Sequence, residues 1–256
     1  MLNRAYSNRL RLLSYNIQTG LETQHYGQYL THSWKHVLPH RARLRNLNRI
    51  ATLLGQYDIV GLQEVDSGSL RSGFVDQTEY LAHRAGFPHW HKQVNRRIGS
   101  IAQHSNGVLS RLKPSDVAEY RLPGLPGRGV IVCQYGGDQG LTVCIMHLAL
   151  GRRARLRQID FVSRLVKSKS HIVLMGDLNC SCESREMRYL MESVGLQEFS
   201  CEKSTFPSWR PMRRIDHILV SDSLCIENAQ VLDYSFSDHL PISIDILIPE
   251  HLKLAG

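Results

Sequence analysis

HIVLMGDLNC, residues 171–180, is the stretch that best indicates the fold of this 256-residue chain. Its apolar run, Ile172 to Met175, is typical of a strand that is buried on both faces of a sheet. After Gly176 come a carboxylate, Asp177, and an amide, Asn179, which are expected on one face because strand side chains alternate. A carboxylate at an apolar strand end is costly unless it is solvated, paired or bound to a cation. The stretch therefore predicts a polar site at the end of a buried strand.

Similar short runs recur on both sides of this stretch and predict further strands. They cover residues 9–17, 58–65, 106–111, 128–135, 141–150, 214–221 and 241–248. Amphipathic helix patterns lie between them, at residues 41–55, 77–86, 152–168 and 184–195. Strands and helices alternate without a Pro- or Ser-rich linker. This favours a single α/β domain over residues 1–256, with an irregular insertion near 19–40.

The composition narrows the classes of function. Hydrophobic residues make up 42 % of the chain, enough for a large core, and the net charge of +8 favours polyanionic partners such as nucleic acid, phosphorylated metabolites or anionic lipid headgroups. No apolar stretch approaches the roughly 20 residues that span a bilayer, so we expect no transmembrane segment. The first residues do not resemble a signal peptide, so we expect a cytoplasmic protein. Nothing in the sequence predicts an obligatory protein partner.

Polar side chains stand at the ends of several predicted strands. They are Asn16, Glu64, His147, Asp177, Asn179, Asp216, Asp238 and His239. Each one alone is compatible with a cap, a turn or a satisfied buried group. If they converge, however, the carboxylates repel one another, and a divalent cation would remove that repulsion. Oxygen donors suit Mg²⁺, whereas the absence of cysteine from the set argues against a structural zinc site.

Seven fragments, in this order, carry a family resemblance. They are SYNI (14–17), LQEV (62–65), NGVLSR (106–111), MHLALG (146–151), GDLN (176–179), RIDHILVS (214–221) and SDHLPI (237–242). The set resembles the endonuclease/exonuclease/phosphatase superfamily, which includes pancreatic-type deoxyribonuclease, abasic-site exonucleases, neutral sphingomyelinases, inositol polyphosphate 5-phosphatases and deadenylases. The resemblance implies a DNase I-like fold: a four-layer α/β sandwich in which two stacked mixed β-sheets are flanked by helices.

The resemblance also implies catalytic roles. Asp177 would orient or deprotonate the attacking water, and Asn179 would hold a phosphate oxygen. His239 would contact the scissile phosphate, with Asp216 orienting its ring. His147 matches a histidine that several branches of the family place near the leaving group.

Metal and phosphate ligands follow from the same resemblance. Glu64 would be the principal Mg²⁺ ligand, with Asn16 and Asp238 close to the metal, and Mn²⁺ is expected to substitute. Asn106 and Arg111 match a motif whose Asn faces the substrate phosphate.

Arginines near two of these strands suggest how a phosphorylated substrate is held. Because RRARLR (152–157) directly follows MHLALG and RPMRRID (210–216) leads into a site strand, we predict phosphate contacts from four arginines. These are Arg152, Arg153, Arg213 and Arg214. The alternative is a solvated helix start and a surface loop. Arginines in a first helical turn oppose the helix dipole, which favours a functional reason for them.

Together these features predict a Mg²⁺-dependent phosphodiesterase, and specifically a nuclease that works by attack of an Asp-oriented water. One alternative is a lipid (sphingomyelinase-like) or small-molecule phosphodiesterase or phosphatase. Another is a catalytically silent polyanion-binding module, which would require a broken site, whereas every expected site residue is present. DNA and RNA, and internal and terminal cleavage, stay open at this point.

Overall fold

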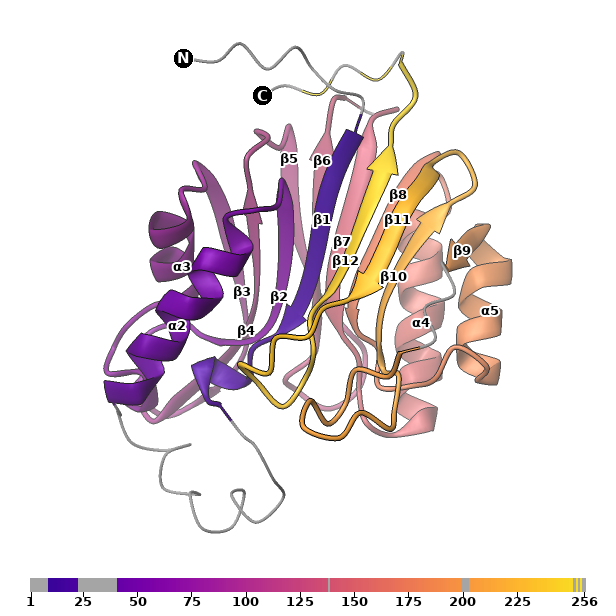
Figure 1. Ribbon diagram of the computed structural model, residues 1–256. Helices are drawn as coiled ribbons and strands as arrows, with labels where there is room; N and C mark the ends of the chain where they lie inside the picture. Colours follow the sequence, from indigo (N-terminus) through magenta and orange to yellow (C-terminus); the bar gives the residue numbers. More distant parts are fainter. Residues whose placement is uncertain are drawn as a thin grey trace, which may run out of the picture.

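Two six-stranded β-sheets are stacked face to face in the computed structural model, which describes residues 9–22, 41–137, 139–198, 203–250, 252 and 254 (Figure 1). The first sheet consists, in spatial order, of β11 (Cys225–Val231), β12 (Ile242–Leu247), β1 (Arg9–Asn16), β2 (Ile59–Asp66), β4 (Ala102–Ser110) and β3 (His89–Ile98). The second consists of β5 (Asp116–Arg121), β6 (Gly129–Tyr135), β7 (Leu141–His147), β8 (His171–Asp177), β10 (Asp216–Ser221) and β9 (Leu196–Glu198).

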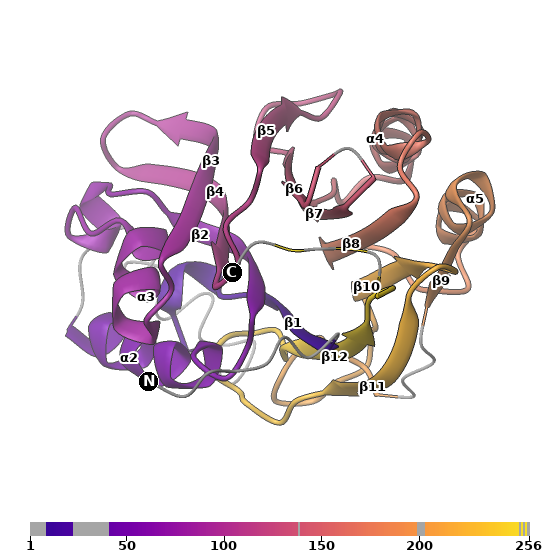
Figure 2. The same ribbon diagram turned by 90° about the horizontal axis from the view of Figure 1, so that it is seen from above.

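Helices cover the outer face of each sheet. α2 (Arg41–Leu54) and α3 (Gln77–Ala85) lie on the first sheet, and α4 (Arg152–Val166) and α5 (Arg185–Val194) lie on the second (Figures 1 and 2). One hydrophobic cluster fills the space between the sheets, and two more lie beneath the helix pairs. The result is the predicted four-layer α/β sandwich with two mixed sheets.

Local sequence explains the central elements. β8 is buried along its whole length, as its apolar run predicts for a strand covered on both faces. α3 begins at Asp76, whose carboxylate accepts hydrogen bonds from the first-turn N–H groups, and ends at Gly86 in the left-handed conformation. α5 is bounded in the same way by Ser184 and Gly195. These caps fix where the helices start and stop.

Each sheet contains one parallel pair of strands, and this pair locates the site. β1 runs parallel to β2, β7 runs parallel to β8, and the chain between the two strands of each pair includes a helix, α2 or α4. All other neighbours are antiparallel. Ligands of such sheets generally bind at the carboxyl ends of the parallel strands. Asn16, His147 and Asp177 are the last residues of β1, β7 and β8.

The sequence predicted the inner strands of both sheets but not the strands at their four edges. These edge strands are β3, β5, β9 and β11. Their side chains are largely half-buried or exposed, so they lack the apolar run that marked the central strands. The strand predicted at 141–150 ends earlier, at His147.

The predicted insertion near 19–40 lies mostly outside the described residues, which resume at 41; before the gap the chain forms a short 3₁₀ turn, η1 (Gln18–Gly20). A second such turn, η3 (Leu70–Ser72), follows β2. Within the described ranges, no helix has the length and apolar character needed to cross a membrane. The single domain over 1–256 stays a prediction.

Candidate active site

Strand ends from both sheets meet at Asp177. In the second sheet, Asp177 lies opposite His147 of β7 and opposite Asp216 of β10. From the first sheet, the Nδ2 of Asn16 donates a hydrogen bond to Asp177 Oδ2 at 3.2 Å. All four side chains are buried. The cluster therefore joins the two sheets at the edge where their parallel strands end.

The carboxylate of Asp177 is held in the ionised form. Its Oδ1 accepts the backbone N–H of Asn179 at 3.0 Å, and its Oδ2 lies 3.3 Å from His147 Nε2 and 3.9 Å from His239 Nε2. Burial opposes ionisation, but the two imidazoles and the Asn179 N–H outweigh it and hold the pKa of Asp177 well below its usual range. An ionised carboxylate at this position can orient a water molecule and accept its proton.

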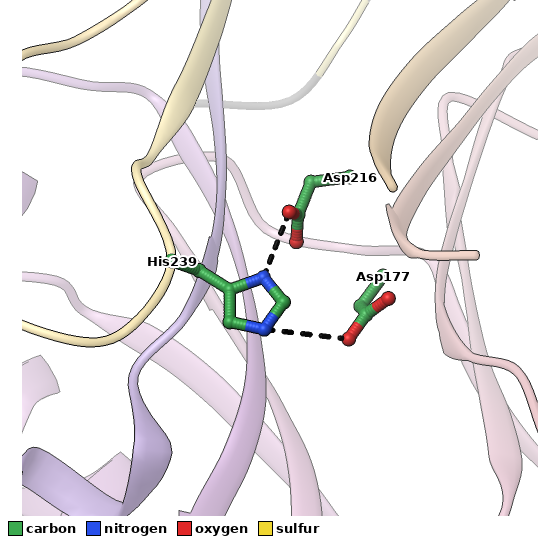
Figure 3. A group of neighbouring side chains, drawn as sticks. All are labelled: Asp177, Asp216 and His239. Carbon is green, nitrogen blue, oxygen red and sulfur yellow. Dashed lines mark hydrogen bonds and ion pairs between the residues drawn. The ribbon is translucent and has the colours of Figure 1, made fainter. Parts of the chain in front are cut away.

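His239 lies between two carboxylates (Figure 3). Its Nδ1 is 2.8 Å from Asp216 Oδ2, which also accepts the hydroxyl of Thr205 at 2.5 Å, and the ring of Phe206 packs against the imidazole with centroids 4.8 Å apart. Burial alone would lower the pKa of His239, but Asp216 and Asp177 together raise it to about 10. The ring is therefore a fixed cationic donor aimed at Asp177.

Arg128, which the sequence did not predict as a site residue, fixes the other histidine. Its Nη1 lies 2.9 Å from His147 Nδ1. A guanidinium only donates hydrogen bonds, so Nδ1 must accept, and the ring proton is placed on Nε2, facing Asp177. Arg128 stands in the glycine-rich turn before β6, a pattern that predicts a hairpin and gives no sign of an active-site role.

A β-bulge presents Glu64 to the site. Gln63 and Glu64 of β2 together lie opposite the single residue Asn106 of β4, and Glu64 has a φ of 55°, which is unfavourable for a residue with a side chain. Burial opposes ionisation of Glu64, but His147 and His239 outweigh it and keep its pKa below its ordinary value. Strain of this kind inside a buried strand is typical of functional positions.

A basic groove of about 860 Å³ opens from these residues. Glu64, Asn106 and His147 line its inner end. Five arginines line its walls: Arg96, Arg128, Arg152, Arg153 and Arg157. Within the described parts of the chain, no ion pair neutralises Arg96, Arg153 or Arg157. In this groove the carboxylate of Glu64 and the imidazole of His147 thus share one space with arginines whose charge is not neutralised.

The sequence profile of the Endonuclease/Exonuclease/phosphatase family matches residues 13–239. The chain belongs to this family. Its members hydrolyse phosphoester bonds, so the chain is placed among the phosphoesterases.

Solved structures share the fold of this family member at low sequence identity. An endonuclease/exonuclease/phosphatase from Beutenbergia cavernae matches with a TM-score of 0.71 and 20 % identity, covering 94 % of this chain and 72 % of that one. A mannosyl-6-phosphatase from Bacteroides thetaiotaomicron gives 0.68 and 18 %, with 93 % and 100 % covered. The catalytic domain of human Nocturnin gives 0.65 and 17 %, with 94 % and 95 % covered. No curated protein sequence matches the chain.

Two sets of donors in this family member are candidates for holding a metal ion. Ligand atoms of Asp177, Asp216 and His239 lie within 4.8 Å of one another, close enough to hold one ion. However, His239 Nδ1 already contacts Asp216, and a protonated ring offers no lone pair to a metal. Glu64 is half-buried at the groove and receives a hydrogen bond from Asn16, so this carboxylate and amide are better suited to a hard cation.

Asp238 lies beside this second set. Its Oδ1 is 3.1 Å from the hydroxyl of Ser237, which is also 2.8 Å from the carbonyl oxygen of Asn16. Asp238 is buried and belongs to the carboxylates that raise the pKa of His239. Asp238 is therefore buried next to the backbone of Asn16, and its role near a metal stays a prediction.

The positions of two asparagines in the site do not follow from the alternation of side chains along a strand. The expectation that Asp177 and Asn179 share a strand face is wrong, because β8 ends at Asp177 and Asn179 has a φ of 53°. The Asn179 Nδ2 donates to the carbonyl of Leu148 at 2.9 Å. Asn106 is also brought to the site, and its Nδ2 donates to the carbonyl of Gly129 at 3.0 Å.

Not all of the predicted phosphate ligands converge. Arg111 does not join the site: its guanidinium donates to the backbone carbonyls of Tyr57, Gly86 and Gly55. It lies beyond the far end of β4, past Ser110, because successive residues of a strand move steadily away from Asn106. The arginine of the NGVLSR fragment therefore anchors turns rather than substrate.

The four loop arginines divide between two places. Arg152 and Arg153 line the basic groove, although Arg152 Nε also lies 3.4 Å from Glu186. Arg213 and Arg214 line a separate cavity, where Arg214 Nη2 pairs with Glu198 at 2.6 Å. The sequence did not predict Arg96 or Arg157 as groove residues. Arg96 belongs to β3, an edge strand that was not predicted, and Arg157 ends the RRARLR run (152–157) but was not named among its phosphate ligands.

Proposed function

We propose that this phosphoesterase is a Mg²⁺-dependent phosphodiesterase that hydrolyses nucleic acid. The basic groove carries the proposal, because Glu64, Asn106 and His147 line it together with several arginines that form no ion pair among the described residues. A substrate with one phosphate needs one cationic contact, whereas a nucleic acid strand presents a series of them. A groove beside the reacting centre that is lined by several guanidinium groups is suited to such a strand.

The site residues divide the chemistry among them. The carboxylate of Asp177 orients the attacking water and accepts its proton, and the imidazolium of His239 donates to a phosphate oxygen. The Nε2–H of His147, fixed by Arg128, is a second donor. Asn179 uses one amide hydrogen on Leu148, which leaves the other for a phosphate oxygen.

Mg²⁺, or Mn²⁺ in its place, would be held by Glu64 and Asn16 with Asp238 nearby, and would neutralise charge on the phosphate oxygens. The negative charge that this set of carboxylates concentrates supports a divalent cation. Neither nucleic acid binding nor the metal requires a protein partner in this proposal.

A second candidate is a lipid phosphodiesterase. Leu125 and Leu150, at the rim of the groove, are 86 % and 75 % exposed. Exposed leucines beside arginines also suit an anionic or zwitterionic lipid surface. The fold is also shared with a mannosyl-6-phosphatase, so a sugar phosphate belongs in the same assay as the lipid.

A substrate panel tests the proposal. Purified protein is incubated with single-stranded RNA, single-stranded DNA, plasmid DNA, sphingomyelin vesicles, inositol phosphates and mannose 6-phosphate, with Mg²⁺, with Mn²⁺ and with EDTA. We expect cleavage of nucleic acid that EDTA abolishes and either metal restores. Turnover of the lipid alone, or of a phosphomonoester alone, would overturn the nucleic acid assignment.

Groove variants test the role of the arginines. Arg96→Ala and Arg153→Ala should raise the KM for nucleic acid and reduce the dependence of log KM on log salt, by about one unit of slope per lost contact. Arg97→Ala is the matched control, because Arg97 is an exposed neighbour on β3 that does not line the groove. If all three variants behave alike, the groove does not bind the substrate.

A further inference from the structure

A second cavity is lined in part by Asn179, whose backbone N–H donates to Asp177. It has a volume of about 810 Å³, similar to that of the basic groove, and its lining includes Asn179, Arg155, Ser204, Met212, Arg213 and Arg214. The two cavities share no lining residue within the described chain. Residues of the site thus line two separate cavities, His147 in the groove and Asn179 in the second cavity.

The beginning of α4 separates the two cavities. Arg152, Arg153 and Arg157 line the basic groove, whereas Arg155 lines the second cavity. Arg155 is buried and held by Glu186, at 3.1 Å, and by the carbonyl of Leu150. This first turn of α4 therefore contributes side chains to both cavities.

Asp177 contacts one lining residue of each cavity. Its Oδ1 is bonded to the backbone of Asn179, which lines the second cavity, and its Oδ2 faces His147, which lines the groove. A phosphorus atom that is attacked by a water held on Asp177 would thus have room for a substituent on each side.

The second cavity has the chemistry of a subsite for a chain. Arg213 is exposed, and no ion pair is formed by its guanidinium within the described residues. Met212 is 57 % exposed beside it, so a cation for a phosphate and an apolar side chain for a base or sugar face lie together. Arg214 is already paired with Glu198, which leaves Arg213 as the principal candidate for a phosphate contact.

From this arrangement we infer that the enzyme cleaves inside a nucleic acid strand: the scissile phosphodiester lies at Asp177, one arm occupies the basic groove and the other arm occupies the second cavity. The inference rests on the proposed function and adds that both ester oxygens carry nucleotides. In the reaction, the water oxygen bonds to phosphorus and one P–O ester bond breaks. The water proton passes to Asp177, and the leaving oxygen ends protonated. One diester and one water thus give a phosphomonoester and an alcohol, with no other reactant.

Circular substrates test internal cleavage directly. Circular single-stranded DNA and circular single-stranded RNA have no ends, and each is compared with the linear strand of the same sequence in Mg²⁺. We expect the circle of the preferred nucleic acid to be linearised at a rate within about tenfold of linear-strand cleavage. Degradation of the linear strand with the circle left intact would overturn the inference but keep the proposed function. No cleavage of either form would reject the proposed function itself.

A pair of variants tests the second cavity. Arg213→Ala should raise the KM for the circular strand about tenfold, the cost of one charged contact of about 1.4 kcal/mol. It should change the hydrolysis of bis(p-nitrophenyl) phosphate, whose two arms are too short to fill the cavity, by much less. Arg210→Ala is the control, because Arg210 is an exposed arginine near the same cavity that does not line it. Equal behaviour of Arg213→Ala and Arg210→Ala would show that the second cavity holds no substrate.

Discussion

Asp177 and His239 shift each other's pKa in opposite directions, downward for Asp177 and upward for His239. Burial penalises the charged form of both, yet the pKa of Asp177 is held low and the pKa of His239 is raised to about 10. Asp216 first and then Asp177 raise the pKa of His239, and His147 first and then His239 lower the pKa of Asp177, so both groups are charged near neutral pH. One group is then ready to accept a proton while the other donates a hydrogen bond.

The substitution Asp177→Asn tests this arrangement. It keeps the side-chain shape but removes the proton acceptor, so kcat should fall by about 10²- to 10⁴-fold. Thermal unfolding and circular dichroism should show a folded protein. Asp222→Asn, at an exposed aspartate outside the site, should keep parental activity. Retention of more than about a tenth of the activity by Asp177→Asn would reject the assigned role.

Arg128 should act through His147 rather than by charge alone. Arg128→Met removes the donor to His147 Nδ1, so the ring can adopt the wrong tautomer, and kcat should fall about ten- to hundredfold. Arg128→Lys, which keeps a donor, should recover part of the loss. The ¹⁵N chemical shifts of the His147 ring report the tautomer directly. A large loss of activity with an unchanged tautomer would contradict this explanation.

At the scale of elements, the site depends on close strand pairing at the end of β8. Gly176 has a φ of 149°, and a Cβ there would overlap the carbonyl oxygen of Met146 in β7. A side chain is thus excluded on both steric and conformational grounds. The glycine lets β7 and β8 approach closely enough to place His147 opposite Asp177.

Gly176→Ala should therefore be strongly destabilising. We expect a loss of about 3 kcal/mol or more in the free energy of unfolding, and a fall in Tm of roughly 6–12 °C. Calorimetry or denaturant titration measures both. Gly151→Ala is the control, because Gly151 has a φ of −84° and no described atom would contact its Cβ. Similar stabilities for the two variants would show that β7 and β8 tolerate separation.

At the scale of the whole molecule, His104 links folding stability to pH. Burial, with Arg71, lowers the pKa of His104 to about 4, against an ordinary value near 6.5. Above pH 6.5 the ring is neutral in the folded and unfolded states alike. Between about 6.5 and 4 only the unfolded state takes up the proton, so stability falls as the pH falls.

The difference in the free energy of unfolding between pH 7 and pH 5 should therefore be smaller in His104→Gln than in the parent protein. For the parent protein we expect His104 to contribute about 1–2 kcal/mol of the loss over this range. Urea titrations of both proteins at each pH, in EDTA, measure it. Buried carboxylates such as Asp66, whose pKa is lowered despite burial by bonds from Ser69 and Arg71, lose their contribution only at lower pH. Parallel pH profiles for parent and variant would disprove the role of His104.

The sequence by itself determined the inner strands, the capped helices and the identity of the converging residues. β8 and α5 were visible because burial on two faces and helical capping leave local patterns in the chain. Asn16, Asp177 and His239 stood out because polar groups at apolar strand ends need a compensating partner. These signals are local, so a single sequence carries them.

Tertiary structure alone decided the features that depend on distant segments. The edge strands β3, β5, β9 and β11 are polar because solvent covers them, and their pairing partners define them more than their own residues do. The bulge that presents Glu64, the contact from Arg128 to His147 and the second cavity beside Asn179 all join residues far apart in the chain. Their physical cause is the stacking of two sheets, which no local pattern records.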